Sequence, residues 1–165
     1  MSDSDGNTPS NKNSDISREK FNRIINNIVD IITEVDLKGY FTYASPQIYD
    51  ILGYTSEEIV GLNGLKLIHP NDLPKTLDKM KETINSGETM TMDYRTQHKD
   101  GHYVYISAKG GIIREKGNVK FLAVLRDVSK QKAMEEKLIK SEEKYREAFE
   151  RAEIYKDLFA HDISN

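Results

Sequence analysis

Cysteine is absent from this chain of 165 residues, and so are long apolar runs and an excess of either charge. Without cysteine the chain can form neither a disulfide nor a thiolate metal site, and chemistry that needs a cysteine nucleophile or photoadduct is excluded. No apolar stretch approaches the ~20 residues of a membrane-spanning helix. The first residues are polar and acidic, unlike a signal peptide. We therefore expect a cytoplasmic protein with no membrane contact in this segment.

Charged residues are frequent but balanced, with Lys+Arg 24 against Asp+Glu 27 and a net charge of -3. A nucleic-acid-binding surface would show a basic excess and a basic stripe, so we expect no nucleic-acid partner. A hydrophobic fraction of 37% over this length suits one domain with appendages.

The N-terminal residues 1–15 are mostly Ser, Asn, Asp, Gly and Pro, which predicts a disordered tail. From residue 16 the apolar side chains become periodic and fall on one helical face: Phe21, Ile24, Ile25 and Ile28. This spacing predicts a helix over residues 16–29. Such a helix needs a partner surface, either on the domain that follows or on a second copy.

Five segments between residues 30 and 129 have the pattern of β-strands: residues 30–36, 40–44, 88–98, 102–113 and 119–128. Asp100-Gly101 is a strong hairpin signal between the third and fourth. The continuous apolar run over residues 121–125 predicts that the last strand is central and covered on both faces.

Short helices separate the second strand from the third. Ser45-Pro46 has the order of an N-cap followed by a first-turn proline. Thr55 and Glu58 have the spacing of a capping box. A longer helix is predicted over residues 72–86, with Asp72 as its N-cap. Helices segregated beside an antiparallel sheet indicate an α+β domain over residues 30–129.

Seven short motifs follow one another in this stretch: the turn at residues 36–39, Ser45-Pro46, Leu52-Gly53-Tyr54, Ser56-Glu57-Glu58-Ile59-Val60-Gly61, Ile68-His69-Pro70-Asn71-Asp72, Lys99-Asp100-Gly101 and Asp127-Val128-Ser129. In this order and spacing, residues 30–129 resemble a PAS sensor domain over their whole length. The resemblance implies a five-stranded antiparallel sheet curved around a small cleft, with short helices closing the cleft. It also implies that the last strand leads directly into an output helix.

The same resemblance assigns signal transmission to Asp127, Val128 and Ser129. In PAS proteins an aspartate at this place typically ties the end of the last strand to the start of the output helix. The alternative is that Asp127 is simply a carboxylate near a helix N-terminus, where the helix dipole favours it.

No cofactor is identified for the cleft. The flavin-photosensor branch of the PAS family needs a cysteine, and the haem branch needs a ligating histidine in the helix before the third strand, where residues 72–86 have none. His69, His98 and His102 fall at turns, where we expect surface roles, and we predict no metal site. A small apolar or weakly polar ligand and an empty cleft both stay open.

Residues 130–160 contain no Gly or Pro, and their eight acidic and eight basic residues are interleaved. Apolar residues recur in alternating steps of four and three, with Ser141 as a polar gap: Met134, Leu138, Tyr145, Ala148, Ala152, Tyr155 and Phe159. This heptad seam predicts a coiled-coil helix that pairs with its copy in a parallel homodimer. The alternative is a single solvated helix packed on its own domain.

The final residues, His161-Asp162-Ile163-Ser164-Asn165, resemble the start of the phosphoacceptor box of sensor histidine kinases. A neutral imidazole nitrogen can attack the γ-phosphate of ATP, and a neighbouring carboxylate can hold the tautomer. By resemblance, His161 is the phosphoacceptor, Asp162 orients it, and Asn165 acts in dephosphorylation.

Residues 130–165 are therefore interpreted as a signalling helix that runs into a truncated dimerisation and phosphoacceptor segment. The sequence contains no second hairpin helix, ATP-binding domain or Gly-rich phosphate loop, so we expect that it does not phosphorylate itself. The function predicted is the signal-input portion of a two-component sensor histidine kinase. Its partners would be a second copy, the ATP-binding domain of the parent kinase and a response regulator. The alternatives are a non-enzymatic PAS ligand-sensing or dimerisation module, and a PAS input to another output domain such as a cyclase.

Overall fold

The computed structural model describes residues 10–163, with side chains described for residues 14–161. The chain divides into two units that meet at the bond between Asp127 and Val128. The first unit holds a sheet and several short helices, and the second is one helix. Within residues 10–163, no helix combines the length and the apolar character needed to cross a lipid bilayer.

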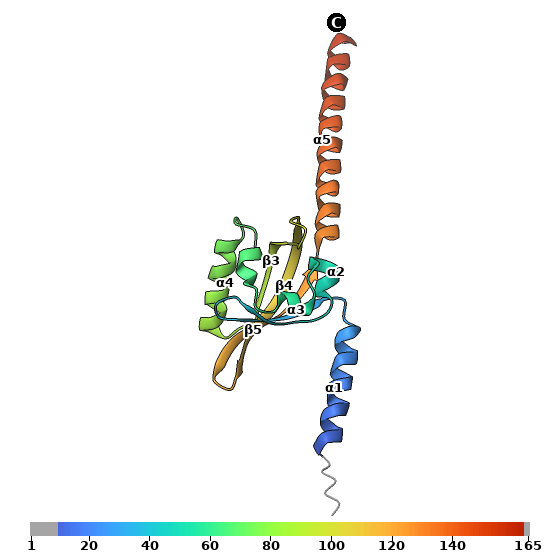
Figure 1. Cartoon of the computed structure of the whole chain (residues 1–165). Helices are drawn as coiled ribbons and strands as arrows, with labels where there is room; N and C mark the ends of the chain where they lie inside the picture. Colours follow the sequence, from blue (N-terminus) through green and yellow to red (C-terminus); the bar gives the residue numbers. More distant parts are fainter. Residues whose placement is uncertain (1–9, 164–165) are drawn as a thin grey trace, which may run out of the picture. The chain divides into compact units, whose positions relative to one another are not determined.

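One five-stranded antiparallel sheet forms the centre of the first unit (Figure 1). Its strands are β1 (Ile31–Asp36), β2 (Phe41–Ala44), β3 (Met90–Gln97), β4 (Tyr103–Glu115) and β5 (Asn118–Asp127). They lie in the order β2-β1-β5-β4-β3, and every neighbouring pair is antiparallel. The α+β class and the five-stranded sheet are confirmed, and so is the central place of the last strand.

Helices occupy the connections and the two ends of the described chain: α1 (Ser10–Asn26), α2 (Ile48–Leu52), α3 (Ser56–Ile59), the 3₁₀ helix η1 (Gly64–Leu67), α4 (Leu73–Ser86) and α5 (Ser129–Ile163). The predicted capping box is present, because Thr55 Oγ1 accepts from the Glu58 N–H at 3.2 Å and Glu58 Oε2 accepts from the Thr55 N–H at 3.0 Å. This box fixes the start of α3.

Two predicted helix caps have other partners. Ser45 is fully buried, and its hydroxyl accepts from the Ile32 N–H at 2.9 Å, so it extends the pairing of β1 with β2 while α2 begins only at Ile48. Asp72 does occupy the N-cap position of α4, but its side chain caps nothing there. Its carboxylate binds Arg95 of β3 instead. In both cases a partner distant in sequence competes successfully with the local backbone.

The N-terminal helix begins earlier than expected. Because α1 starts at Ser10 and ends at Asn26, residues 10–15 are helical and the predicted boundaries at 15 and 29 are wrong. The rest of the predicted tail, residues 1–9, lies outside the described residues. Ile25 is buried, and its carbonyl accepts from Gln47 Nε2 at 2.7 Å, which anchors the end of α1.

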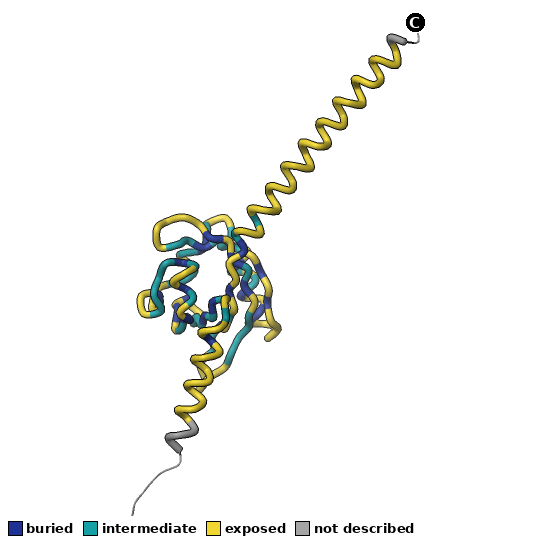
Figure 2. The backbone as a smooth tube through the Cα atoms, turned by 90° about the vertical axis from the view of Figure 1, so that its right-hand side faces the viewer, coloured by how far each residue is buried: buried dark blue, intermediate teal, exposed yellow. Residues whose placement is uncertain are grey.

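The hydrophobic core lies on the face of the sheet that α2, α3 and α4 cover. Figure 2 shows the buried residues gathered in the first unit, whereas α5 is exposed along nearly its whole described length. Along β5, Phe121 and Leu125 are buried in this core, whereas Leu122 and Val124 are 39% and 40% exposed. The predicted cover on both faces of β5 is therefore wrong. An apolar run reports the central position of a strand, but it does not report which of its faces a helix covers.

Candidate functional site

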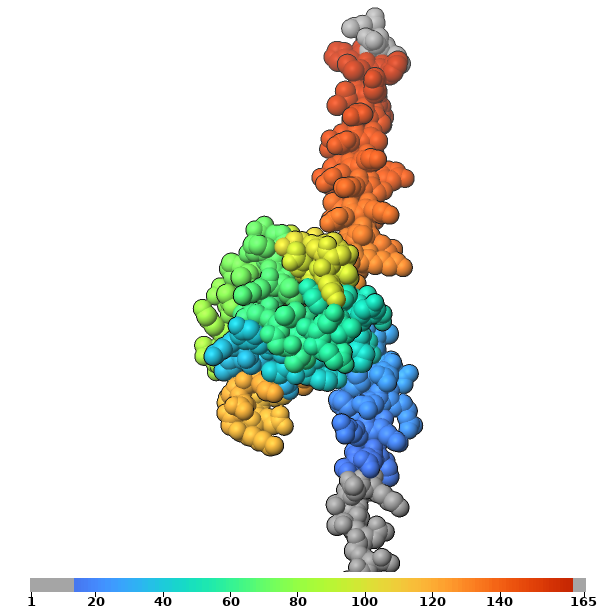
Figure 3. Space-filling model, in the orientation of Figure 1, coloured from blue at the N-terminus to red at the C-terminus, as the bar shows by residue number. Residues whose placement is uncertain are grey.

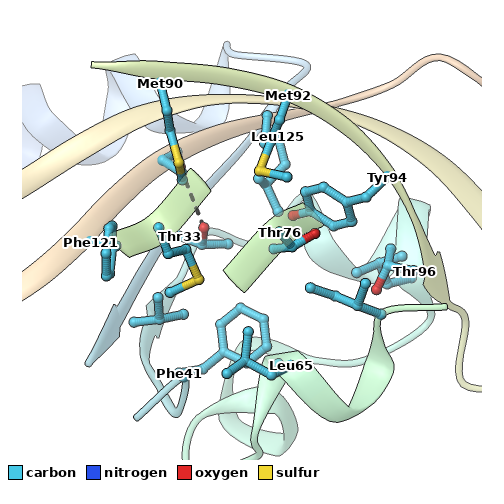
Figure 4. A pocket seen from close by; sticks show the side chains of 18 residues that line it. Thr33, Phe41, Leu65, Thr76, Met90, Met92, Tyr94, Thr96, Phe121 and Leu125 are labelled. Carbon is cyan, nitrogen blue, oxygen red and sulfur yellow. Dashed lines mark hydrogen bonds between the residues drawn. The ribbon is translucent and has the colours of Figure 1, made fainter. Parts of the chain in front are cut away.

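A cavity of about 80 Å³ lies between the inner face of the sheet and the helices (Figure 4). Since roughly 10–15 Å³ of such space holds one water molecule, a small molecule of several heavy atoms fits. Apolar side chains and glycines make up most of the wall: Val35, Gly39, Phe41, Leu52, Gly64, Leu65, Ile68, Met80, Met90, Met92, Ala108, Phe121, Ala123 and Leu125. Four hydroxyl residues complete it: Thr33, Thr76, Tyr94 and Thr96.

The hydroxyl groups differ in their partners. Thr33 Oγ1 donates to the Ala123 carbonyl at 3.4 Å, and Thr76 Oγ1 donates to the Asp72 carbonyl at 2.9 Å. The Tyr94 hydroxyl points into the cavity and has no hydrogen-bond partner among the residues whose side chains are described (Figure 4). Burial raises the pKa of Tyr94 to about 12, so it is a neutral phenol that can donate one hydrogen bond.

Uncharged side chains alone line this cavity, and they would suit a neutral, mainly apolar ligand with one polar atom. A charged ligand would lose its hydration without gaining a counter-charge from the wall, which is costly. The flexible methionines of the cavity wall, Met80, Met90 and Met92, can adapt to ligands of different shape.

The passage from sheet to helix is short. β5 ends at Asp127, α5 begins at Ser129, and only Val128 stands between them. The hydrogen-bond ladder of the helix starts at once, because the Lys132 N–H donates to the Val128 carbonyl at 2.9 Å. Leu125, two residues before the end of β5, is part of the cavity wall. One strand therefore connects the cavity directly to the start of the helix.

The sequence profile of the family described as "PAS fold" matches residues 41–125, from the start of β2 to the last part of β5. The chain belongs to the PAS fold family. The match covers the cavity walls contributed by four of the strands, so the cavity is that of a PAS domain.

Among relatives, the White collar 1 protein of Neurospora crassa is 26% identical over 94 residues, which are 57% of this chain and 8% of that protein. A sensory box histidine kinase/response regulator structure from Burkholderia thailandensis has a TM-score of 0.62 at 23% identity, covering 77% of this chain and 98% of that one. The N-terminal domain of a diguanylate cyclase with PAS/PAC sensor from Marinobacter aquaeolei has a TM-score of 0.53 at 25% identity. The match covers 62% of this chain and 97% of that one.

The predicted phosphoacceptor segment is only partly described. His161 is exposed on α5 and shares a surface hollow with Ile154, Asp157 and Leu158. Asp162 is helical in its backbone, but its side chain and all of Asn165 lie outside the described residues. The roles assigned to these three residues, and to the segment 127–129 in signal transmission, stay predictions.

The structure also brings together three side chains at a turn where the sequence predicted exposed histidines and no metal site. At the turn between β3 and β4, Asp100 Oδ1 lies 3.1 Å from His98 Nδ1 and 2.5 Å from His102 Nδ1. The three residues together could hold a metal ion. The alternating order His-x-Asp-x-His around an Asp-Gly turn is the signal that could have revealed this grouping.

Proposed function

We propose that this chain is the signal-input portion of a two-component sensor histidine kinase. In this proposal the PAS domain senses a small neutral ligand in its cavity, α5 carries the response as a parallel dimer, and His161 accepts the phosphoryl group. The observation that carries it is the continuity of β5, which lines the cavity through Leu125 and ends at Asp127, directly before α5.

The seam of α5 supports pairing with a second copy. Met134, Leu138 and Tyr145 are 63%, 60% and 78% exposed in the single chain. Large apolar side chains repeated in heptad steps are normally buried against a partner helix, which stabilises by about 1.5–3 kcal/mol for each side chain fully buried. In a parallel homodimer, the seam of one α5 would be buried against the same seam of the second copy.

The last part of α5 is apolar over a wider arc than a two-stranded coiled coil uses. Phe149, Ile154 and Leu158 lie off the seam and are 66%, 60% and 59% exposed. A helix that is apolar on more than one side suits a bundle of several helices. This widening favours a helical-hairpin bundle as the structure that residues near 150–163 enter.

His161 follows Ile154 and Leu158 at helical steps of seven and three, so the three side chains share one face. The seam, through Tyr155 and Phe159, occupies another face. Pairing of two copies along the seam would thus not by itself bury the imidazole. The neutral ring attacks the γ-phosphate, its attacking nitrogen forms the new N–P bond, ADP leaves, and the ring proton is lost to solvent or to a base.

A ligand that fills the cavity would press on Leu125 and shift the end of β5. Because only Val128 separates β5 from α5, a small change there would alter the pairing of α5 and the access to His161. The phosphoryl group would then pass to a response regulator.

A second candidate is a PAS input to a diguanylate cyclase, favoured by the likeness to the Marinobacter aquaeolei domain. The cavity and the paired helix would serve that output equally well, with His161 as a bystander.

A phosphotransfer experiment distinguishes the kinase proposal from the cyclase candidate. The chain is incubated with labelled ATP and the ATP-binding domain of a histidine kinase supplied in trans, and acid-labile, base-stable phosphate is measured. We expect label on the chain and on a His69→Gln control, and none on His161→Gln. Equal labelling of the unsubstituted chain and both variants, or no labelling of any of them, would contradict the kinase proposal.

A further inference from the structure

The turn between β3 and β4 places two imidazoles and one carboxylate around a common point, away from the PAS cavity. We propose that His98, Asp100 and His102 form a binding site for a divalent transition-metal cation of the zinc type. The site is independent of the kinase proposal, because it uses no residue of the cavity or of α5.

Ligand spacing supports the site. One ligand atom from each of the three residues lies within 4.8 Å of the other two. Asp100 Oδ1 lies 3.1 Å from His98 Nδ1 and 2.5 Å from His102 Nδ1. Tetrahedral zinc, with ligand bonds of about 2.0–2.2 Å, holds its ligand atoms roughly 3.3 Å apart. Both distances from Asp100 Oδ1 are shorter than this, so binding a cation requires the carboxylate to draw back from the two rings.

The two imidazole rings lie next to each other at the turn. His98 and His102 are stacked with their ring centroids 4.5 Å apart and an interplanar angle of 22°. Nδ1 of each ring lies within 3.1 Å of the same carboxylate oxygen, Asp100 Oδ1. Because the lone pair of Nδ1 lies in the plane of its ring, at least one ring must rotate out of this stack before both nitrogens can bind one cation.

The hydrogen bond at His98 also suits a metal. The Asp100 N–H donates to His98 Nδ1 at 3.1 Å, which requires a lone pair at Nδ1 and the tautomer a cation needs. Binding replaces this hydrogen bond, and water can take the released N–H at an exposed turn. At His102, Nδ1 is 2.5 Å from Asp100 Oδ1, and a proton on this nitrogen must move to Nε2 or to solvent before Nδ1 can bind a cation.

The base of the site is closely packed against the end of α2. The His98 ring packs so closely against α2 that a side-chain Cβ at Gly53 would lie 2.6 Å from its Cε1. The Lys99 N–H donates to the Leu52 carbonyl at 2.9 Å, which ties the turn to the end of α2. The Lys99 ammonium is held by Glu58 at 2.7 Å, so its charge is matched by a carboxylate.

The outer side of the site is open. The side chains of Asp100 and His102 are 61% and 59% exposed. The yellow atoms near residue 100 lie at the surface beside the teal atoms of residues 48–59 (Figure 3). Asp50 lines the same surface hollow as His98 and Asp100 and adds negative charge. A cation can therefore enter from solvent and complete its coordination with water.

The donor set selects the class of metal. Two imidazoles and one carboxylate suit Zn²⁺, Ni²⁺ or Cu²⁺, whereas Mg²⁺ and Ca²⁺ prefer oxygen ligands alone. A bound cation would clamp the β3–β4 turn, which is already held at the end of α2. The PAS domain would thus respond to a metal at its surface as well as to a ligand in its cavity.

Isothermal titration with ZnCl₂ tests the site. The full chain carrying His161→Gln is used, so that the exposed histidine of α5 cannot contribute. We expect saturable binding of one Zn²⁺ per chain, no binding of Mg²⁺, and Zn²⁺ affinity weakened at least tenfold by His102→Gln, since even outer-shell changes cost about 10–100-fold. Asp100→Asn should weaken it similarly, because the amide keeps the turn acceptor but removes the charge.

His69→Gln is the matched control, because its ring also accepts a backbone N–H two residues ahead but lies outside the group. It should leave Zn²⁺ affinity unchanged. Imidazole ¹⁵N spectra should show Zn²⁺-dependent shifts of Nδ1 at His98 and His102 only. No saturable binding, or binding that survives both His102→Gln and Asp100→Asn, would overturn the proposal.

Discussion

The carboxylate of Asp72 holds Arg95 at three points. Its Oδ2 accepts from the backbone N–H and from Nε of Arg95, each at 2.9 Å, and its Oδ1 accepts from Nη2 at 2.8 Å. The pair joins the start of α4 to β3, between Tyr94 and Thr96 of the cavity wall. Hydrogen bonds from the Arg95 side chain hold the pKa of Asp72 at about 2, below its ordinary value of 3.8.

Replacing this carboxylate should destabilise the PAS domain at neutral pH. Asp72→Asn removes the charge that Arg95 binds, and we expect a loss of about 1–3 kcal/mol in the free energy of unfolding, because a partly buried guanidinium loses its partner. Urea denaturation at pH 7 measures it. Glu82→Gln, at an exposed surface pair with Lys79, is the control and should stay within about 0.5 kcal/mol.

The stabilisation by Asp72 should depend on pH in a defined direction. Because its pKa is lower in the folded state, its contribution is complete above about pH 4 and is lost as the pH falls towards about 2. The difference between the wild type and Asp72→Asn should therefore shrink through this window. A difference that stays constant down to pH 2 would show that the charge is not its source.

Gly110 of β4 lies where β4 and β5 approach closely, so we expect a substitution there to destabilise the fold. A Cβ there would lie 2.2 Å from the Leu122 carbonyl oxygen and 2.8 Å from Ala123 Cβ. Gly110→Ala should therefore cost about 1–3 kcal/mol, because the central pair β4–β5 must separate. Gly111→Ala is the neighbouring control, since a Cβ at Gly111 would have Thr89 Cγ2 as its nearest atom, at 3.5 Å. Thermal unfolding of both variants measures the contrast; equal melting temperatures would contradict the register of β4 on β5.

Removal of the Tyr94 hydroxyl from the cavity should leave the fold intact. Tyr94→Phe breaks no hydrogen bond of the described chain, so we expect the free energy of unfolding to change by less than about 0.5 kcal/mol. A neutral ligand that accepts from this hydroxyl should bind roughly two- to tenfold more weakly, since one hydrogen bond contributes about 0.5–1.5 kcal/mol. Denaturation, and titration with the ligand once it is found, test both parts. A large loss of stability would mean that the hydroxyl has a structural partner.

Local patterns in the sequence were enough to predict most of the fold. Alternating apolar residues predicted the five strands, and the spacing of Thr55 and Glu58 predicted a cap that is present. Errors arose where a distant residue competes with the local chain. Ser45 binds Ile32, and Asp72 binds Arg95, so neither side chain caps a helix.

The candidate sites were less accessible from sequence. The cavity is assembled from segments spread over residues 33–125, and its volume depends on packing that no local pattern contains. The grouping of His98 with His102 depends on the geometry of one turn. The heptad seam of α5 is visible in the sequence, but the partner that covers it stays a prediction.

Parallel pairing of α5 is the claim on which the proposed relay depends, and the lack of native cysteine allows a direct test. Single cysteines are placed on the seam by Leu138→Cys, Tyr145→Cys and Ala152→Cys, and on the opposite face by Glu136→Cys, Glu143→Cys and Glu150→Cys. A disulfide needs Cα atoms about 4.4–6.8 Å apart, so identical positions are joined only across a parallel, in-register seam. Mild oxidation should yield cross-linked dimers for the three seam variants and not for the three matched controls. Absence of cross-links on the seam, or equal cross-linking on both faces, would contradict the parallel dimer and with it the path from the PAS cavity to His161.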